Sequence, residues 1–141
     1  MISLYASQLR VSLKTGIDMI NITDNIDSLV TESKIQTGTA ALTVIGSTGS
    51  ITTIEYEPGV ISDLKRAINK MAPPGEPYEH EKAWHDGNGH SHVQAAIIGP
   101  SISIPVRNGG ISLGTWQQLV VINHDNRPRE RTIKLSIIGD G

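Results

Sequence analysis

The chain has 141 residues, no cysteine and a formal net charge of −2. This length corresponds to one domain. Nucleic-acid-binding proteins usually have a basic face and aromatic residues on which bases stack, and this chain, with its near-neutral charge and few aromatic residues, has neither. Because there is no cysteine, any bound metal would need nitrogen and oxygen ligands. The chain also lacks a membrane-spanning apolar run and a signal-peptide pattern, so we expect a cytoplasmic protein that does not bind membranes.

Strands and helices alternate through the first half of the chain. Three segments have the alternating or β-branched composition that is typical of strands: 9–13, 40–45 and 51–56. The glycines of residues 46–49 either join or break the last two strands. Thr23 is expected to be the N-cap of a helix that buries Ile26. The clearest helix opens at Pro58, carries apolar residues at helical spacing and ends before Pro73.

The second half of the chain is predicted to be rich in strands. A short helix is expected at 92–98, because two alanines interrupt any strand-like alternation there. Strands are expected in four further segments: 101–106, 111 onward, 118–122 and 132–138. The pattern predicts a single α+β domain over residues 1–141, in which antiparallel strands form a sandwich or closed sheet with two or three short helices.

One polar segment, residues 78–92, contains four of the five histidines: His80, His85, His90 and His92. Carboxylates and Asn88 lie between them, and such clusters are typical of metal or anion sites. The alternative is a solvated loop that happens to be rich in histidine. His90 and His92 would share a face only in extended chain and would diverge in a helix. The expected cofactor is a divalent metal, either zinc or magnesium or manganese.

Two carboxylates outside this segment are candidates for the same site. Glu55 ends an apolar strand shortly before the helix that carries Asp63. If both point into one cleft, they would complete the metal shell or act as acid and base. The alternative for Asp63 is an exposed acid in the first turn of its helix, where the helix dipole favours it.

Arginines near the C-terminus suit the recognition of phosphate. Arg127, Arg129 and Arg131 alternate with other residues, so an extended segment would project them to one side as a bidentate clamp for phosphate oxygens. Arg129 and Arg131 are the preferred phosphate ligands, whereas Arg127 fits an exposed hairpin end. Arg107, in a turn, either joins in phosphate binding or serves solubility.

Two further segments have alternative interpretations. Trp116 and Gln117 are neighbours, so in a strand they point to opposite faces, and we expect one to enter the core while the other meets the cleft or a neighbouring subunit. Residues 46–49, Gly-Ser-Thr-Gly, would either cradle an anion with backbone N–H groups or form a simple turn.

Several of these residues also carry a resemblance to a known family. The block Gly114-Thr115-Trp116-Gln117, within residues 101–119, resembles the signature of the YjbQ-like family, also called secondary thiamine-phosphate synthases. Other matching positions follow the order and spacing of the family, and they cover the last two-thirds of the chain: Glu55, Asp63, Tyr78, His80, Asn88, His92, Gly99, Ser101, Pro128, Arg129 and Arg131. The extended 84–92 segment resembles the archaeal-type members.

The resemblance implies a β-rich α+β fold, a homotrimer and an activity. The activity is the condensation of hydroxymethylpyrimidine diphosphate with thiazole phosphate, which gives thiamine phosphate and pyrophosphate. It also favours His80 and His92 over the other two histidines as metal ligands, and adds Asn88 to Glu55 and Asp63 as candidate catalytic residues. Two departures stand out: many members carry a His-Thr-Thr-Ala-like run at residues 46–49, and many carry glutamate at the position of Asn123.

Two classes of function therefore remain open at the level of sequence. The first is a metal-dependent enzyme that acts on phosphorylated small molecules, similar to the thiamine-phosphate synthases. In that case the metal and the arginines would neutralise a diphosphate leaving group. The second is a non-catalytic trimer that binds a metal or a small anion, with the histidines at an interface. A hydrolase that uses metal-bound water is a weaker third interpretation.

Overall fold

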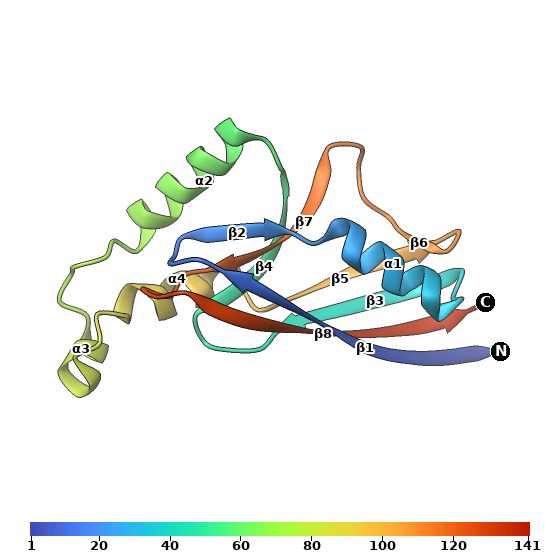
Figure 1. Cartoon of the computed structure of the whole chain (residues 1–141), viewed down its shortest axis with the longest axis horizontal. Coiled ribbons are helices and arrows are strands. Elements are labelled where there is room, and N and C mark those ends of the chain that lie inside the picture. Colours follow the sequence, from blue (N-terminus) through green and yellow to red (C-terminus); the bar gives the residue numbers. More distant parts are fainter.

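A computed structural model describes residues 1–141, and it shows an α+β fold with two antiparallel sheets (Figure 1). The larger sheet contains five strands in the spatial order β1 (Ile2–Leu13), β8 (Arg129–Asp140), β3 (Thr37–Val44), β5 (Ser101–Arg107) and β6 (Gly110–Ile111). The smaller sheet contains β2 (Asp18–Asn21), β7 (Gln117–Asn123) and β4 (Gly49–Glu55), in that order. The predicted fold class is confirmed.

Four helices accompany the sheets: α1 (Thr23–Ser33), α2 (Pro58–Met71), α3 (Glu79–Trp84) and α4 (Gly89–Ile98). Figure 1 shows α1 lying along the long strands, whereas α3 lies at the end of the molecule opposite the two chain termini. None of these helices is long and apolar enough to cross a membrane.

The core follows from the alternation of side chains along the strands. On β8, Ile133, Leu135 and Ile137 are buried, and the residues between them are more exposed. They pack with side chains of β3, β5, β7 and α1 into one cluster that is built from isoleucine, leucine, valine and alanine. Each such buried side chain contributes about 1.5–3 kcal/mol, so a core without phenylalanine is still a strong one.

The glycine-containing segment 46–49 marks a change of sheet. The strands before and after it were predicted, and the structure places β3 in the larger sheet and β4 in the smaller one. The glycines therefore break the two strands apart. Residues 46–48 connect the two sheets and lie beside the β7–β8 turn, where Thr48 donates a hydrogen bond to Asp125, so two distant segments of the chain meet there.

Helix ends differ in part from the sequence-based expectation. Ile22, not Thr23, occupies the N-cap position of α1, because the Thr23 hydroxyl donates to Asn21 Oδ1 at 2.7 Å and accepts from the Leu119 N–H at 2.8 Å. The α2 helix begins at Pro58 as predicted. The side chain of Glu57 caps it by accepting two backbone hydrogen bonds.

The histidine-rich segment is more ordered than a loop. It contains α3, and α4 begins at Gly89 rather than at residue 92. The Glu81 carboxylate holds the turn between them, since it accepts from the N–H groups of Gly87 at 2.7 Å and Gly89 at 2.8 Å. Strand β2 was not predicted, and β1 is longer than its predicted segment.

Candidate functional site

A polar cavity of about 510 Å³ lies where the 46–48 segment, α3, α4 and the β7–β8 turn meet. Only one of its eleven lining residues is hydrophobic, and that residue is Trp84 on α3. The wall on the side of the β7–β8 turn carries Arg129 and Arg131, and the opposite wall carries His80 and His92. The cavity therefore joins the predicted phosphate-binding arginines with the two histidines that the sequence favoured.

Arg131 is the most unusual residue of this cavity, because its side chain is only 5% exposed and it contacts no carboxylate. Its Nη2 donates to Thr48 Oγ1 and Asn123 Oδ1, both at 2.6 Å, and its Nε is buried without a partner. Its Nη1 makes no hydrogen bond within the chain and lies against Gly46, 2.6 Å from the position that a Cβ on this residue would take. Burial lowers the pKa of Arg131 below its ordinary value, although nearby Asp125 acts in the opposite direction.

Asp125 is the centre of the hydrogen-bond network that shapes this wall. Its buried carboxylate accepts from Thr48 Oγ1 at 2.9 Å, Asn88 Nδ2 at 3.1 Å and Arg129 Nε at 3.0 Å. Burial alone would raise the pKa of Asp125, but these three hydrogen bonds outweigh it and the pKa is lowered. Asp125 is therefore an ionised anchor for its neighbours, and its charge is balanced by Arg129.

The 46–48 segment contributes backbone donors to the cavity. The N–H groups of Gly46, Ser47 and Thr48 make no hydrogen bond within the chain. Gly46 has a φ of +125°, a conformation that favours glycine, and it leaves the space that the Arg131 guanidinium approaches. Successive free N–H groups beside a guanidinium are suited to an anion.

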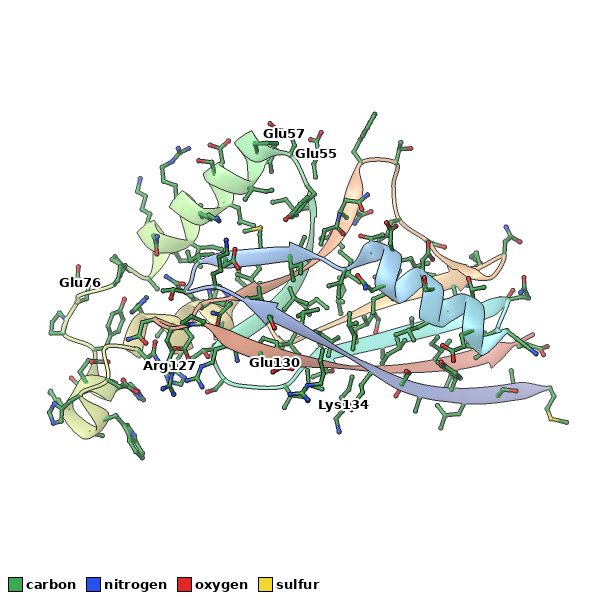
Figure 2. The ribbon with its side chains drawn as sticks, viewed as in Figure 1. Glu55, Glu57, Glu76, Arg127, Glu130 and Lys134 are labelled. Atoms are coloured by element: carbon green, nitrogen blue, oxygen red, sulfur yellow. The ribbon has the colours of Figure 1, made fainter.

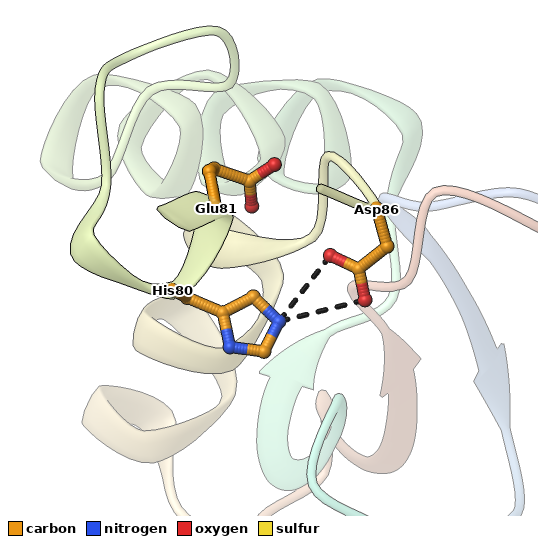
Figure 3. A group of neighbouring side chains, drawn as sticks. All are labelled: His80, Glu81 and Asp86. Atoms are coloured by element: carbon orange, nitrogen blue, oxygen red, sulfur yellow. Dashed lines mark hydrogen bonds and ion pairs between the residues drawn. The ribbon is translucent and has the colours of Figure 1, made fainter. Parts of the chain in front are cut away.

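On the histidine side of the cavity, His80 lies beside Asp86 and Glu81 (Figure 3). His80 Nε2 lies 3.2 Å from Asp86 Oδ1, and the rings of His80 and His92 are tilted against each other with centroids 4.5 Å apart. The pKa of Asp86 is lowered, first by the hydrogen bond from the Asn88 N–H and also by His80. The structure thus brings together the two preferred histidines, one from α3 and one from α4.

The ligand atoms of His80, Glu81 and Asp86 all lie within 4.8 Å of one another. Two ligands of a tetrahedral zinc ion are separated by about 3.3 Å, given bonds of about 2.0 Å. The 3.2 Å between His80 Nε2 and Asp86 Oδ1 fits that separation, so this donor set suits a divalent metal. Glu81 is the weaker member, because both of its oxygens already accept backbone hydrogen bonds.

The other two histidines of the segment lie outside the cavity lining. His85 is the exposed C-cap residue of α3, with a φ of 52°. His90 is half-buried in the first turn of α4, where helical geometry directs it away from His92, and burial lowers its pKa. Asn88 does line the cavity, but its amide is engaged with Asp125, Ser91 and the Asn126 N–H, which fixes the start of α4.

Glu55 and Asp63 do not share a cleft with the histidines. Glu55 lies at the opposite end of β4 from Gly49, about 20 Å away at 3.3 Å per residue. Figure 2 shows Glu55 and Glu57 beside the start of α2, well apart from Arg127 at the β7–β8 turn. Asp63 is exposed on α2, as the alternative interpretation expected, but it lies beyond the first turn of the helix and forms an ion pair with Arg66 at 2.9 Å.

The expected division of Trp116 and Gln117 between core and surface is wrong. Both are exposed, because they precede the point at which β7 enters the core; Trp116 is 73% exposed and Gln117 bonds Thr53 Oγ1. Trp116 and Glu55 line a separate hollow of about 440 Å³ at that end of the smaller sheet. Arg107 is exposed at the end of β5, where it donates to the carbonyl oxygens of Gly38 and Val106, and it does not line the cavity.

The chain matches the family model described as UPF0047 protein YjbQ-like over residues 7–140. The chain belongs to the YjbQ-like family. It is 30% identical over 135 residues to a UPF0047 protein of Methanothermobacter thermautotrophicus, covering 96% of this chain and 92% of the relative. It is 32% identical over 124 residues to the UPF0047 protein YugU of Bacillus subtilis, covering 86% of this chain and 90% of YugU.

Solved structures of the YjbQ-like family have the same fold. A YbjQ-like protein of unknown function from Sulfolobus solfataricus superimposes with a TM-score of 0.94 and 29% identity, covering 99% of this chain and all of that one. A YjbQ/UPF0047 family protein from Clostridium acetobutylicum gives a TM-score of 0.80 and 32% identity, covering 92% of this chain and 98% of that one. The expected family is confirmed, and it is a family whose function is not characterised.

Sequence reasoning missed the residues that hold the arginine wall in place. Asp125 and Thr48 each occur in a polar turn, and short polar residues are common in turns for local reasons. His124, the one histidine outside residues 78–92, is buried between Ser50 Oγ at 2.7 Å and Gln94 Oε1 at 2.9 Å. Burial lowers the pKa of His124 to about 4, so its ring is neutral at physiological pH.

Proposed function

We propose that the cavity binds the phosphoryl group of a small phosphorylated molecule. The observation that carries this proposal is Arg131, a buried guanidinium without a carboxylate partner at the wall of a polar cavity. A buried charge that lacks a counter-charge is costly, and an anion that reached it would offset that cost. Asp125 fills this role only in part, because it raises the pKa of Arg131 but forms its ion pair with Arg129.

The donors around Arg131 are of the kinds that bind a phosphoryl group. Nη1 of Arg131 and the N–H groups of Gly46, Ser47 and Thr48 lack partners within the chain and come from one corner of the cavity. Arg129 lines the same cavity, with only its Nε committed to Asp125. Charge-assisted hydrogen bonds from guanidinium and backbone donors are the usual means of holding phosphate oxygens.

We further propose that the chain is an enzyme of the kind that the family resemblance implies, which transfers an organic group from a diphosphate and releases pyrophosphate. The arginines would bind the leaving diphosphate as its C–O bond breaks and a C–N bond to the thiazole nitrogen forms, and His80, held by Asp86, would face the reacting end of the substrate. A divalent metal held by His80 and Asp86, with Glu81 and His92 beside them, would add charge neutralisation when bound.

A second candidate is a non-catalytic protein that binds a metal or an anion. The grouping of His80, Glu81 and Asp86 within 4.8 Å supports it, because these ligand atoms lie together without any substrate. In either case we propose a homotrimer, as the resemblance implies. Light scattering in solution would give three times the 15.2 kDa chain mass for a trimer and rule it out for any other value.

The phosphate site is tested by titration calorimetry with inorganic pyrophosphate. Arg131→Lys keeps the charge but loses the fork-shaped donor, so we expect pyrophosphate affinity to fall by at least about tenfold. Arg107→Lys, at an exposed arginine outside the cavity, is the matched control and should bind as the wild type does. Equal affinity in all three proteins, or no binding to the wild type, would contradict the proposed site.

The proposed reaction is tested by pyrophosphate release. Hydroxymethylpyrimidine diphosphate and thiazole phosphate are supplied together to the wild type and to His80→Ala. The enzyme proposal expects release that depends on both compounds and is lost in the variant. Tight pyrophosphate binding without any turnover would favour the non-catalytic candidate.

A further inference from the structure

A second hollow adjoins the cavity beside α4, and we refer to it as the α4 groove. Its volume is about 360 Å³, and Gly46, Ser47 and His92 line both the cavity and the groove. The groove is completed by four small residues: Gly49, Ala95, Ala96 and Pro100. Because the two hollows have three lining residues in common, one ligand can extend from the cavity into the groove.

The chemistry of the groove is opposite to that of the cavity. Apart from the His92 ring and the Ser47 hydroxyl, its lining carries no polar side chain, and it carries no carboxylate, amine or guanidinium. Alanine, glycine and proline leave room for an uncharged group and offer it apolar contact. The volume is that of a small-molecule site, and it is too small for a peptide helix, whose diameter with side chains is about 10–12 Å.

Arg131, the residue that carries the proposed phosphate site, lies beside the junction of the two hollows. Its side chain is 5% exposed, and its Nε has no hydrogen-bond partner. Nε lies 3.2 Å from the place of a Cβ on Gly49, and Nη1 lies 2.6 Å from the place of a Cβ on Gly46. Both glycines line the groove, so Arg131 lies next to the junction, although its guanidinium lines the cavity alone.

We propose that the α4 groove binds an uncharged organic group, about the size of one ring, whose phosphoryl group occupies the cavity. This inference rests on the proposed phosphate site and adds the residues that select the rest of the ligand. Ala96 lies at the exposed rim of the groove and Ala95 at its buried base, so these two positions on α4 set the size of group that is accepted. The half-buried His92 ring forms the boundary between the charged and the apolar part of the ligand.

The test compares inorganic phosphate with phenyl phosphate by titration calorimetry at about pH 8, where both are largely dianions. We expect the wild type to bind phenyl phosphate about tenfold more tightly than phosphate, because the ring leaves water for an apolar groove. In Ala96→Leu, whose three added carbons occupy the rim of the groove and block entry of a ring, the ratio of the two affinities should fall to near one. Val93→Leu, on the same helix but outside the groove lining, should keep the ratio of the wild type.

The outcomes separate this inference from the phosphate site on which it rests. If the wild type binds phosphate but the ratio is near one, or if Ala96→Leu keeps a tenfold ratio, the groove does not hold the organic group and only the present inference is overturned. If the wild type binds neither anion, the phosphate site is wrong and the inference is wrong with it.

Discussion

Replacing Gly46 with alanine should displace the buried guanidinium of Arg131. The new Cβ would lie 2.6 Å from Arg131 Nη1, whereas ordinary contact begins at 3.4 Å, so the guanidinium must move by about 0.8 Å. Such a shift is not free, because Nη2 is held by hydrogen bonds of 2.6 Å to Thr48 and Asn123. The backbone adds strain, since the φ of +125° at Gly46 is one that side chains disfavour.

A matched variant separates the collision from the strain. Gly99 has a φ of +101°, and a Cβ added there meets nothing within 4 Å, so Gly99→Ala measures backbone strain without any displaced neighbour. Hydrogen bonds to a charged group are worth about 1.5–3 kcal/mol each. We therefore expect Gly46→Ala to lower the free energy of unfolding by about 2–4 kcal/mol more than Gly99→Ala does.

Urea denaturation measures the stability difference, and calorimetry with inorganic phosphate measures its effect on the site. Weakening of one charge-assisted contact should lower phosphate affinity about 10- to 100-fold in Gly46→Ala and leave it unchanged in Gly99→Ala. Equal destabilisation by the two substitutions, with equal phosphate affinity, would refute the argument that Gly46 exists to accommodate Arg131.

Three further results are expected. The pKa of His124 is about 4 in the folded protein, below the ordinary value of 6.5. Between pH 6.5 and pH 4 the unfolded chain therefore binds more protons than the folded one. The free energy of unfolding should fall by up to about 3 kcal/mol as the pH drops from 6.5 to 4. The urea midpoint should change less with pH in His124→Gln than in His90→Gln. The same change with pH in both variants would contradict this prediction. Glu57→Ala removes the cap of α2 and should lower the free energy of unfolding by about 1 kcal/mol in the same urea assay, with phosphate affinity unaffected. An unchanged free energy of unfolding would show that the cap is dispensable. Elemental analysis of unchelated protein should find about one divalent ion per chain and almost none in His80→Ala; a metal-free wild type, even after added zinc or manganese, would remove the metal from the proposal.

Local patterns were enough to predict the two walls of the cavity. Arg129 and Arg131 alternate along β8, which puts both on one face, and this follows from the period of a strand alone. His80 and His92 lie close in the sequence, so the segment between them needs only one reversal to bring the rings together. The α2 helix was predicted for the same reason, since proline marks its beginning and its end.

Long-range pairing decided what sequence reasoning missed. The distance between Glu55 and the histidines depends on the assignment of β4 to the smaller sheet, and no local pattern encodes that assignment. The role of Asp125 depends on Asn88 and Thr48, which lie 37 and 77 residues away in the chain. Thr23 resembles an N-cap residue, but the partner that takes its hydroxyl out of that role is the N–H of Leu119, 96 residues away.

The most direct test of the account is a crystal structure of the protein in complex with pyrophosphate. We expect a phosphoryl group within hydrogen-bond distance of Arg131 Nη1 and the N–H groups of residues 46–48, with Arg129 on the same side of the cavity. Pyrophosphate bound elsewhere, for example at the exposed Arg107, with Arg131 still without an anionic partner, would contradict the central claim.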